Sequence, residues 1–519
     1  MSGFLYHYHP VEPATWFYLS SLLMIGLFFK FSRFWSVRNL DLVLLILLAP
    51  GLLFIHYGKL SYHRELWESQ RAASATMNEG TGAPIVNGDV AAADSADESI
   101  LSSDVDTEQT RTGQREALST GDRDGELLTD AAPVDEGAVD GDTETVEDMA
   151  DLEPPLSSGQ QAQKYGYLWL YGAGMLVLAR LLADPTMVRR PLLEPNLSAG
   201  GLTFISCSLF VFLMANVISR PSDDVLTADP LSPDAVTLQE TVRVDEGPGY
   251  SLLASLPSPV QKTLAILAHL TVVVGMVLIG YWHFDNIIMG VGAATLYLML
   301  PYTSLMTNEI KHVMPAASLV WAVLCYRRPM TAGVFLGLAG GMTYYPLFLL
   351  PLWLSFYWPR GLYRFISGVG VVLVLLVFVL FSSSGVVHSV RLMFGLYPPA
   401  MDNLRGIWDM SLNGWSSYYR IPVLAAFVAL ASSLALWPAQ KNLGTLLSCS
   451  AAVMVATQFW HGYGGGIYMA WYLPLLLLTI FRPNLEDRVA LTVLAEGWLP
   501  RRMSLLPTGK AAFSSSHVS

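Results

Sequence analysis

Charged residues are scarce in this sequence, at 14% of the chain against 53% hydrophobic residues. So few charges cannot cover the surface of a water-soluble protein of 519 residues, which excludes that class. Cysteine is scarce as well, because Cys207, Cys325 and Cys449 are the only three. Their spacing fits neither a disulfide framework nor a metal site, and we expect no metal and no cofactor. The expected partners are membrane lipids rather than nucleic acid.

Aromatic residues are absent from Glu68 to Lys164. Between Glu79 and Glu153 there are 22 acidic and three basic residues, so the rest of the chain is net basic although the whole chain carries −12. A segment this acidic and this poor in apolar residues cannot bury enough surface to offset its ordering entropy. We therefore predict a long disordered acidic tether over residues 63–164.

Apolar runs dominate the remainder and predict an all-α, polytopic transmembrane helical bundle of about 13 spans. Asp41 stands at the start of the second span, where the helix dipole favours a carboxylate, and Arg180 can snorkel from the third span to the interface. The predicted spans are 14–31, 41–57, 165–182, 201–218, 262–281, 287–305, 313–326, 365–381, 421–437, 443–459 and 467–481, with a pair of short helices around residues 343–346.

That short pair is the most informative stretch. The sequence AGVFLGLAGGMTYYPLFLLPLWL combines closely spaced glycines with a break at Thr343-Tyr344-Tyr345-Pro346. Two helices of about 14 residues are short for a bilayer crossing at ~1.5 Å per residue. Such broken helices are tolerated at membrane depth where protein or water satisfies the freed backbone groups, which is how a site is built inside a membrane.

This helix pair, with the basic residues before it, resembles that of the GT-C superfamily of membrane glycosyltransferases. These enzymes move sugars from polyprenyl-phosphate carriers to acceptors at the outer membrane face. Many members have Lys where this chain has Thr343. The resemblance covers residues 201–483 and implies a GT-C-like membrane module there. The other expected parts are a two-helix segment (1–62), a third helix with a basic loop (165–200) and a cytoplasmic tail (484–519).

The basic residues predict one orientation in the plasma (inner) membrane, with an external N-terminus and a cytoplasmic C-terminus. This choice obeys the positive-inside rule along the chain. It places on the cytoplasmic side Lys30, Arg33, Arg38, Arg189, Arg190, Arg327, Arg328, Arg360, Arg364, Lys441, Arg482 and Arg488. The tether, the helix break and most polar loops then share the external face.

The site residues are predicted on that external face. The resemblance implies an acidic pair in the first large external loop, and Asp245-Glu246 stands there. A carboxylate suits the general base that takes a proton from the acceptor hydroxyl, so Asp245 is the first candidate, with Glu246 and Glu309 behind it. The departing polyprenyl phosphate needs cations and polar groups near the bilayer surface. The candidates for binding it are Lys311, His312, Tyr344, Tyr345, Arg391, Arg405, Arg420 and His461.

Two other functions stay open from the sequence. A non-catalytic membrane protein that keeps the same architecture would carry these residues without converging them on one cavity. A lipid or solute transporter would show paired half-helices in two repeats, and this sequence has one broken pair. An acidic loop that only avoids the membrane also explains Asp245 and Glu246.

Overall fold

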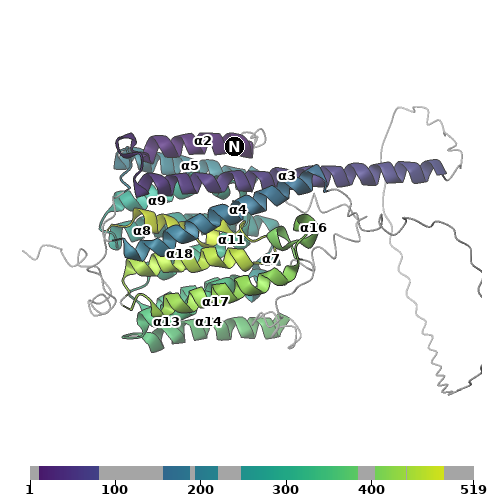
Figure 1. The fold of residues 1–519 in the computed structure, drawn as a ribbon. Helices are drawn as coiled ribbons and strands as arrows, with labels where there is room; N and C mark the ends of the chain where they lie inside the picture. The colour runs from purple at the N-terminus through teal and green to yellow at the C-terminus, as the bar shows by residue number, and fades with distance from the viewer. Residues whose placement is uncertain are drawn as a thin grey trace, which may run out of the picture. The chain divides into compact units, whose positions relative to one another are not determined.

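The computed structural model describes residues 11–80, 156–187, 193–219, 247–383, 404–439 and 441–483. Throughout these ranges the regular secondary structure is helical, apart from isolated bridge residues such as the pair Arg405 and Tyr463. The predicted all-α class is therefore confirmed for the part of the chain that the structure describes. Figure 1 shows the helices of the bundle running alongside one another.

Most of the longer helices follow the predicted apolar runs. Their bounds are α2 (Pro13–Phe28), α3 (Val37–Gly80), α4 (Ser158–Ala183), α5 (Ala199–Ser219), α8 (Ser258–Trp282), α9 (Ile287–Met299), α11 (Ile310–Leu324), α12 (Pro329–Met342), α14 (Leu362–Ser383), α17 (Arg420–Leu436) and α18 (Leu443–Trp460). Of these, α3 is much longer than its predicted run 41–57. Shorter helical elements join them, namely α7 (Pro248–Ala254), α10 (Pro301–Leu305), η6 (Tyr345–Leu349), α13 (Leu350–Tyr357), η7 (Gly406–Trp408), α16 (Met410–Asn413), η9 (Met469–Trp471) and α19 (Leu473–Phe481).

Seven helices in the described residues are long and apolar enough to cross a membrane. Five more apolar helices have 10–17 residues, and α19 has nine. One reason for the shorter lengths is proline. The predicted span 287–305 is divided where Leu300 adopts an extended conformation before Pro301, which cannot continue the hydrogen-bond ladder of α9. The chain is therefore a helical protein with several candidate membrane spans, and the prediction of 13 is not confirmed.

The contacts divide the chain into two units, one comprising Met1–Trp67 with Leu156–Ser519 and the other Glu68–Pro155. The N-terminal helices thus belong to the same compact unit as the predicted module 201–483. The tether predicted over 63–164 was too long at both ends, because α3 continues to Gly80 and α4 begins at Ser158. A capping box at Ser157 and Gln160 starts α4, and this is a local sequence signal for the start of a helix. Residues 81–155 lie outside the described residues.

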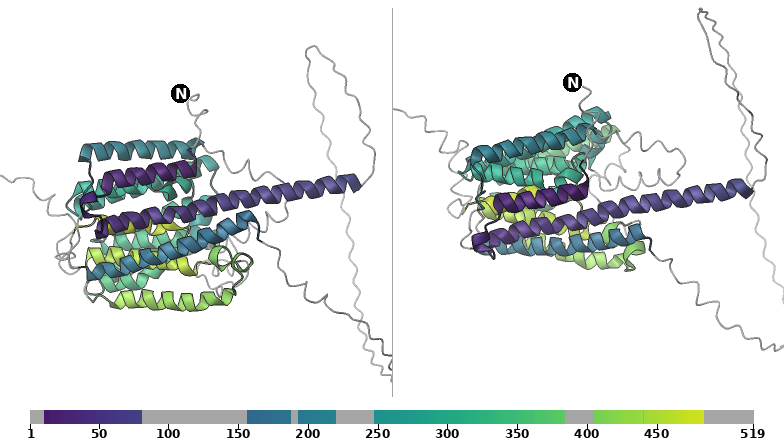
Figure 2. Two further views of the ribbon diagram at one scale, coloured as in Figure 1. Left: turned by 45° about the horizontal axis from the view of Figure 1, so that its top comes forward. Right: turned by 90° about the horizontal axis from the view of Figure 1, so that it is seen from above.

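Helix α18 is the centre of the compact unit. All of its residues are buried, and it lies between α4 and α17, as Figure 1 shows. On the side of α4 that faces away from α18, small residues let α4 approach α3 closely. A Cβ added at Gly159 would lie 2.5 Å from the backbone nitrogen of Tyr62, and one at Gly58 would lie 2.8 Å from the carbonyl oxygen of Gly159. Figure 2 shows these two helices side by side from two directions.

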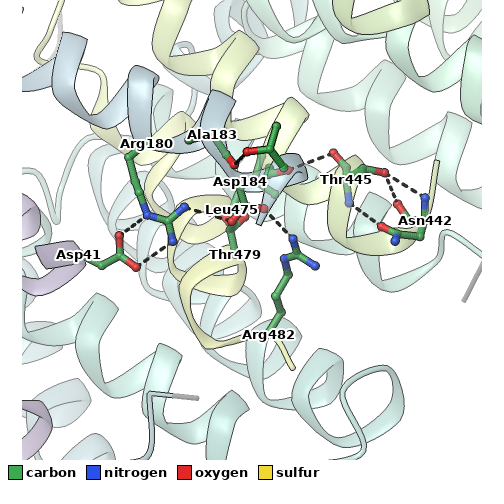
Figure 3. A network of polar contacts seen from close by, with 11 residues as sticks. Asp41, Arg180, Ala183, Asp184, Asn442, Thr445, Leu475, Thr479 and Arg482 are labelled. Carbon is green, nitrogen blue, oxygen red and sulfur yellow. Dashed lines mark hydrogen bonds and ion pairs between the residues drawn. The ribbon is translucent and has the colours of Figure 1, made fainter. Parts of the chain in front are cut away.

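A buried network of four charges joins these N-terminal helices to the end of the bundle (Figure 3). Arg180 donates from Nε and Nη2 to the two oxygens of Asp41, at 2.6 and 3.0 Å, and from Nη1 to Asp184 at 3.1 Å. Arg482 donates to the other oxygen of Asp184 at 2.6 Å. The network has two positive and two negative charges, and Gly444 leaves room for the Arg482 guanidinium.

This network corrects two interpretations of the sequence. Asp41 does not lie in the first turn of α3, which begins at Val37, so the helix dipole is not its partner. Arg180 does not snorkel, because its side chain is only 9% exposed and two carboxylates bind it. The pairing of Arg180 with Asp184 has the i,i+4 spacing of a helical ion pair, whereas its pairing with Asp41 has no sequence signal because the two residues are 139 positions apart.

Candidate functional site

The predicted helix break forms the base of the site. Helix α12 ends at Met342, Thr343 is extended, and η6 begins at Tyr345. The backbone N–H of Gly247 donates to the carbonyl oxygen of Met342 at 2.9 Å, which satisfies one carbonyl freed by the end of the helix. A Cβ at position 247 would lie 2.3 Å from the carbonyl oxygen of Gly341, so this contact requires glycine. The break is confirmed, and the loop that ends at Gly247 reaches it.

A column of stacked rings rises from the break. Tyr345 stacks on His461 with ring centroids 4.6 Å apart, His461 contacts Tyr468 at 4.5 Å, and Tyr468 stacks on His312 at 4.6 Å. The four rings come from η6, the loop after α18, the segment before η9 and the start of α11. The column therefore joins segments that are more than 100 positions apart in the chain.

The two predicted tyrosines have different positions in this arrangement. Tyr345 is fully buried, between His461 and Trp471, whose rings lie 4.6 and 5.1 Å away. Tyr344 is half-buried, stacks on Tyr345 at 4.2 Å and donates its hydroxyl to the Tyr345 oxygen at 2.9 Å. Tyr344 can therefore contact a ligand, whereas Tyr345 supports the column.

His461 is held as a neutral imidazole. Its Nδ1 accepts a hydrogen bond from the backbone N–H of Tyr463 at 3.1 Å, so Nε2 carries the proton of the neutral ring. Burial lowers the pKa of His461 to about 3, and the positive charges of Arg420 and Lys311 act in the same direction. The sequence placed His461 among the phosphate-binding cations; in this environment it offers a hydrogen-bond donor without a charge.

His312 is built into the column in a similar way. Its Nδ1 lies 2.6 Å from the hydroxyl of Tyr302, and its ring is 2% exposed. The neighbouring Lys311 and Glu309 are more accessible, with side chains 28% and 46% exposed, and Nζ lies 4.0 Å from Oε2. The start of α11 therefore offers one cation and one carboxylate beside the ring column.

Arg405 and Arg420 reach the site by different routes. The backbone of Arg405 forms two hydrogen bonds with the loop after α18, from its N–H to Gly462 at 2.8 Å and from Gly464 to its carbonyl at 3.3 Å. Its side chain is half-buried. Arg420 instead is 4% exposed, donates from Nε to the carbonyl of Trp460 at 2.6 Å and lies over the Trp460 ring. Arg420 thus caps the end of α18 and positions the loop that carries His461.

The structure adds Lys59 to the predicted residues. Lys59 lies on α3 and is exposed, yet it is close enough to Lys311, Arg405 and Glu309 to interact electrostatically with all three. The sequence signal for it was its place two residues after the predicted span 41–57, at the same predicted face as the other cations. The predicted residues Asp245, Glu246 and Arg391 lie outside the described residues.

The described part of the site therefore carries an excess of positive charge and lies beside a column of aromatic and neutral histidine rings. Three cations, Lys59, Lys311 and Arg405, lie near two carboxylates among the described residues, Glu309 and Asp409. Such a surface attracts an anion at the end of a membrane bundle. No family model, curated protein or solved structure matches this chain.

Proposed function

We propose that this protein is a membrane glycosyltransferase that moves a sugar from a polyprenyl-phosphate carrier to an acceptor at the outer face of the membrane. The observation that supports it is the gathering of Lys311, Arg405 and Glu309 beside the helix break and the ring column. A polyprenyl phosphate presents its charge at the membrane surface, where cations with few carboxylate partners bind it well.

In this reaction the acceptor hydroxyl oxygen attacks the anomeric carbon. The bond from that carbon to the phosphate oxygen breaks, and a base removes the hydroxyl proton. We assign the base to Asp245, with Glu246 and Glu309 as the next candidates. The support for Asp245 is that Gly247, two positions later in the chain, is hydrogen-bonded to the helix break.

The other residues divide the remaining tasks. Lys311 and Arg405 bind the phosphate as it leaves with an additional negative charge. His461 is fully buried in the ring column, and its Nδ1 is occupied by the N–H of Tyr463, so we assign it the task of positioning the column beside the phosphate. Tyr344 offers an accessible ring face on which a sugar can stack.

The test is a transfer assay with purified full-length protein. A panel of radiolabelled polyprenyl-phosphate sugars is supplied with cell membranes as the source of acceptor, and labelled product is counted. Asp245→Asn should lower kcat by ~10²–10⁴ while carrier binding persists. Arg405→Ala should chiefly raise the KM for the carrier, because it removes a phosphate contact. Asp285→Asn makes the same chemical change at an exposed position between α8 and α9 and should leave kcat and KM unchanged.

Two results would contradict the proposal. If no carrier in the panel supports transfer although carriers bind, the chain is a non-catalytic protein that keeps this architecture. If Asp245→Asn retains full activity while Glu309→Gln loses it, the base is Glu309 and the assignment of Asp245 is wrong.

A further inference from the structure

We propose that helix α3 supplies a third ligand-binding cation, Lys59, so that the N-terminal helices form one wall of the anion site. The chemistry recognised is a phosphate monoester or free phosphate. This inference rests on the proposed function only in taking the physiological ligand to be a phosphorylated lipid. It extends the site beyond residues 201–483, to which the resemblance is confined.

The packing of α3 and α4 fixes where Lys59 stands. Gly58, the preceding residue, faces α4, and a Cβ there would lie 2.8 Å from the backbone nitrogen of Gln163. Backbones this close leave no freedom for α3 to slide along or rotate against α4. Lys59 is therefore held at a fixed level of the helix pair, with its side chain exposed.

Helix α4 in turn contacts the loops that carry the other site residues. A Cβ on Gly406, the neighbour of Arg405, would lie 3.0 Å from the ring of Tyr167, and one on Gly464 would lie 3.3 Å from the Tyr167 hydroxyl. The rigid path from Lys59 through α4 thus ends at the loop that bears Arg405. This path explains how segments 346 positions apart bring Lys59 and Arg405 within electrostatic range.

The charges at this point are not balanced among the described residues. Lys59, Lys311 and Arg405 face two carboxylates, Glu309, whose Oε2 lies 4.0 Å from Nζ of Lys311, and Asp409, which lies with Arg405 beside Tyr167. Like charges repel, so gathering three cations costs stability unless an anion binds between them. In the buried charge network, Asp41, Arg180, Asp184 and Arg482 balance fully. This difference in charge balance is our reason for placing the anion site beside Lys59.

The experiment compares Lys59→Gln with Arg64→Gln in the full-length purified protein. Arg64 is an exposed cation on the same helix and gives a matched loss of one positive charge. The probe is geranylgeranyl monophosphate, whose binding is followed by calorimetry at low salt, with inorganic phosphate as a competitor. Lys59→Gln should weaken binding about tenfold, as expected for the loss of one charge-assisted contact, and Arg64→Gln should change it less than twofold. Thermal unfolding of both variants should match that of the unchanged protein.

The outcomes separate the alternatives. If Lys59→Gln binds the probe as tightly as the unchanged protein while Arg405→Gln binds it weakly, Lys59 is not part of the site. Absence of probe binding to the unchanged protein would equally overturn the inference. Competition by inorganic phosphate at concentrations similar to those of the probe supports a free-phosphate site, and weak competition supports a lipid phosphate. Binding that depends on Lys59 without any sugar transfer would keep the inference and reject the proposed glycosyltransferase.

Discussion

Carboxylates have different roles in the two charged clusters of this bundle, depending on whether the cations around them are matched in number. Asp184 accepts hydrogen bonds from both Arg180 and Arg482 and is fully buried, whereas Glu309 is 46% exposed and meets more than one cation. A buried, balanced set stabilises a fold only while all members are present, because removing one leaves a charge without a partner.

Asp184→Asn should therefore destabilise the protein by about 3–5 kcal/mol, since Arg482 then has no carboxylate within reach among the described residues. The effect is measured as a fall in the midpoint of thermal unfolding and in the yield of folded protein. Asp285→Asn makes the same change at an exposed position and should have almost no effect. An Asp184→Asn protein of normal stability would show that the network contributes little.

His461 predicts a pH dependence of stability. Its pKa is about 3 in the folded protein and about 6.5 in an unfolded chain, so at intermediate pH only the unfolded state binds the proton. Stability is therefore fully present above about pH 6.5 and is lost as the pH falls toward 3; the loss at pH 5 is about 2 kcal/mol. Thermal unfolding at pH 7 and pH 5 measures it, and His461→Gln should reduce the difference. An undiminished difference would assign the effect to other groups.

At the scale of helices, the sequence predicted most elements and few of their contacts. The apolar runs located α5, α8, α17 and α18 to within a few residues at either end, because hydrophobicity and length are local properties. The break at Thr343 was also predictable, since Pro346 and the preceding glycines are local signals. The extension of α3 to Gly80 was not, because residues 69–80 have no aromatic residue and few large apolar residues, which favours disorder.

The candidate site was predictable in part for the same reason. Counting the predicted membrane crossings along the chain puts four residues on one face of the membrane, namely Glu309, Lys311, Arg405 and His461. The structure brings these residues together. Their individual roles depend on tertiary contacts that no pattern shows. The hydrogen bond from Tyr463 makes His461 a neutral donor, and the carbonyl oxygen of Trp460 accepts a hydrogen bond from Arg420.

The contact between Gly247 and the helix break can be tested at this scale. Gly247→Ala would put a Cβ 2.3 Å from the Gly341 carbonyl oxygen, so the loop must move away or the break must distort. We expect a loss of about 1–3 kcal/mol in stability and weaker activity of the site. Gly172→Ala, in α4 with open space around it, should leave stability unchanged or slightly raised. If both variants behave alike, the loop does not depend on this contact.

For the whole molecule, the arrangement of charge suggests an orientation in the membrane. The balanced network with Arg482 and the site with Lys59 lie at different levels of helices α3 and α4, because Asp41 is near the start of α3 and Arg180 near the end of α4, whereas Lys59 and Tyr167 lie farther inside these helices. The positive-inside rule puts the loops around Arg33, Arg189, Arg327 and Lys441 on the cytoplasmic side. On this prediction the site would face outward, as the proposed external glycosyl transfer requires.

That orientation can be tested without any assumption about function. Single cysteines at Ser119 and Ser514, in a chain whose three native cysteines are replaced, are labelled in intact cells with a membrane-impermeant maleimide. Ser119→Cys should react and Ser514→Cys should react only after the cells are opened, because Ser119 is predicted outside and Ser514 inside. The reverse pattern would turn the site toward the cytoplasm and remove the argument for an external acceptor. Labelling at both positions would mean that the number of crossings is even, and one of the short apolar helices between Ile287 and Tyr357 would then be re-entrant.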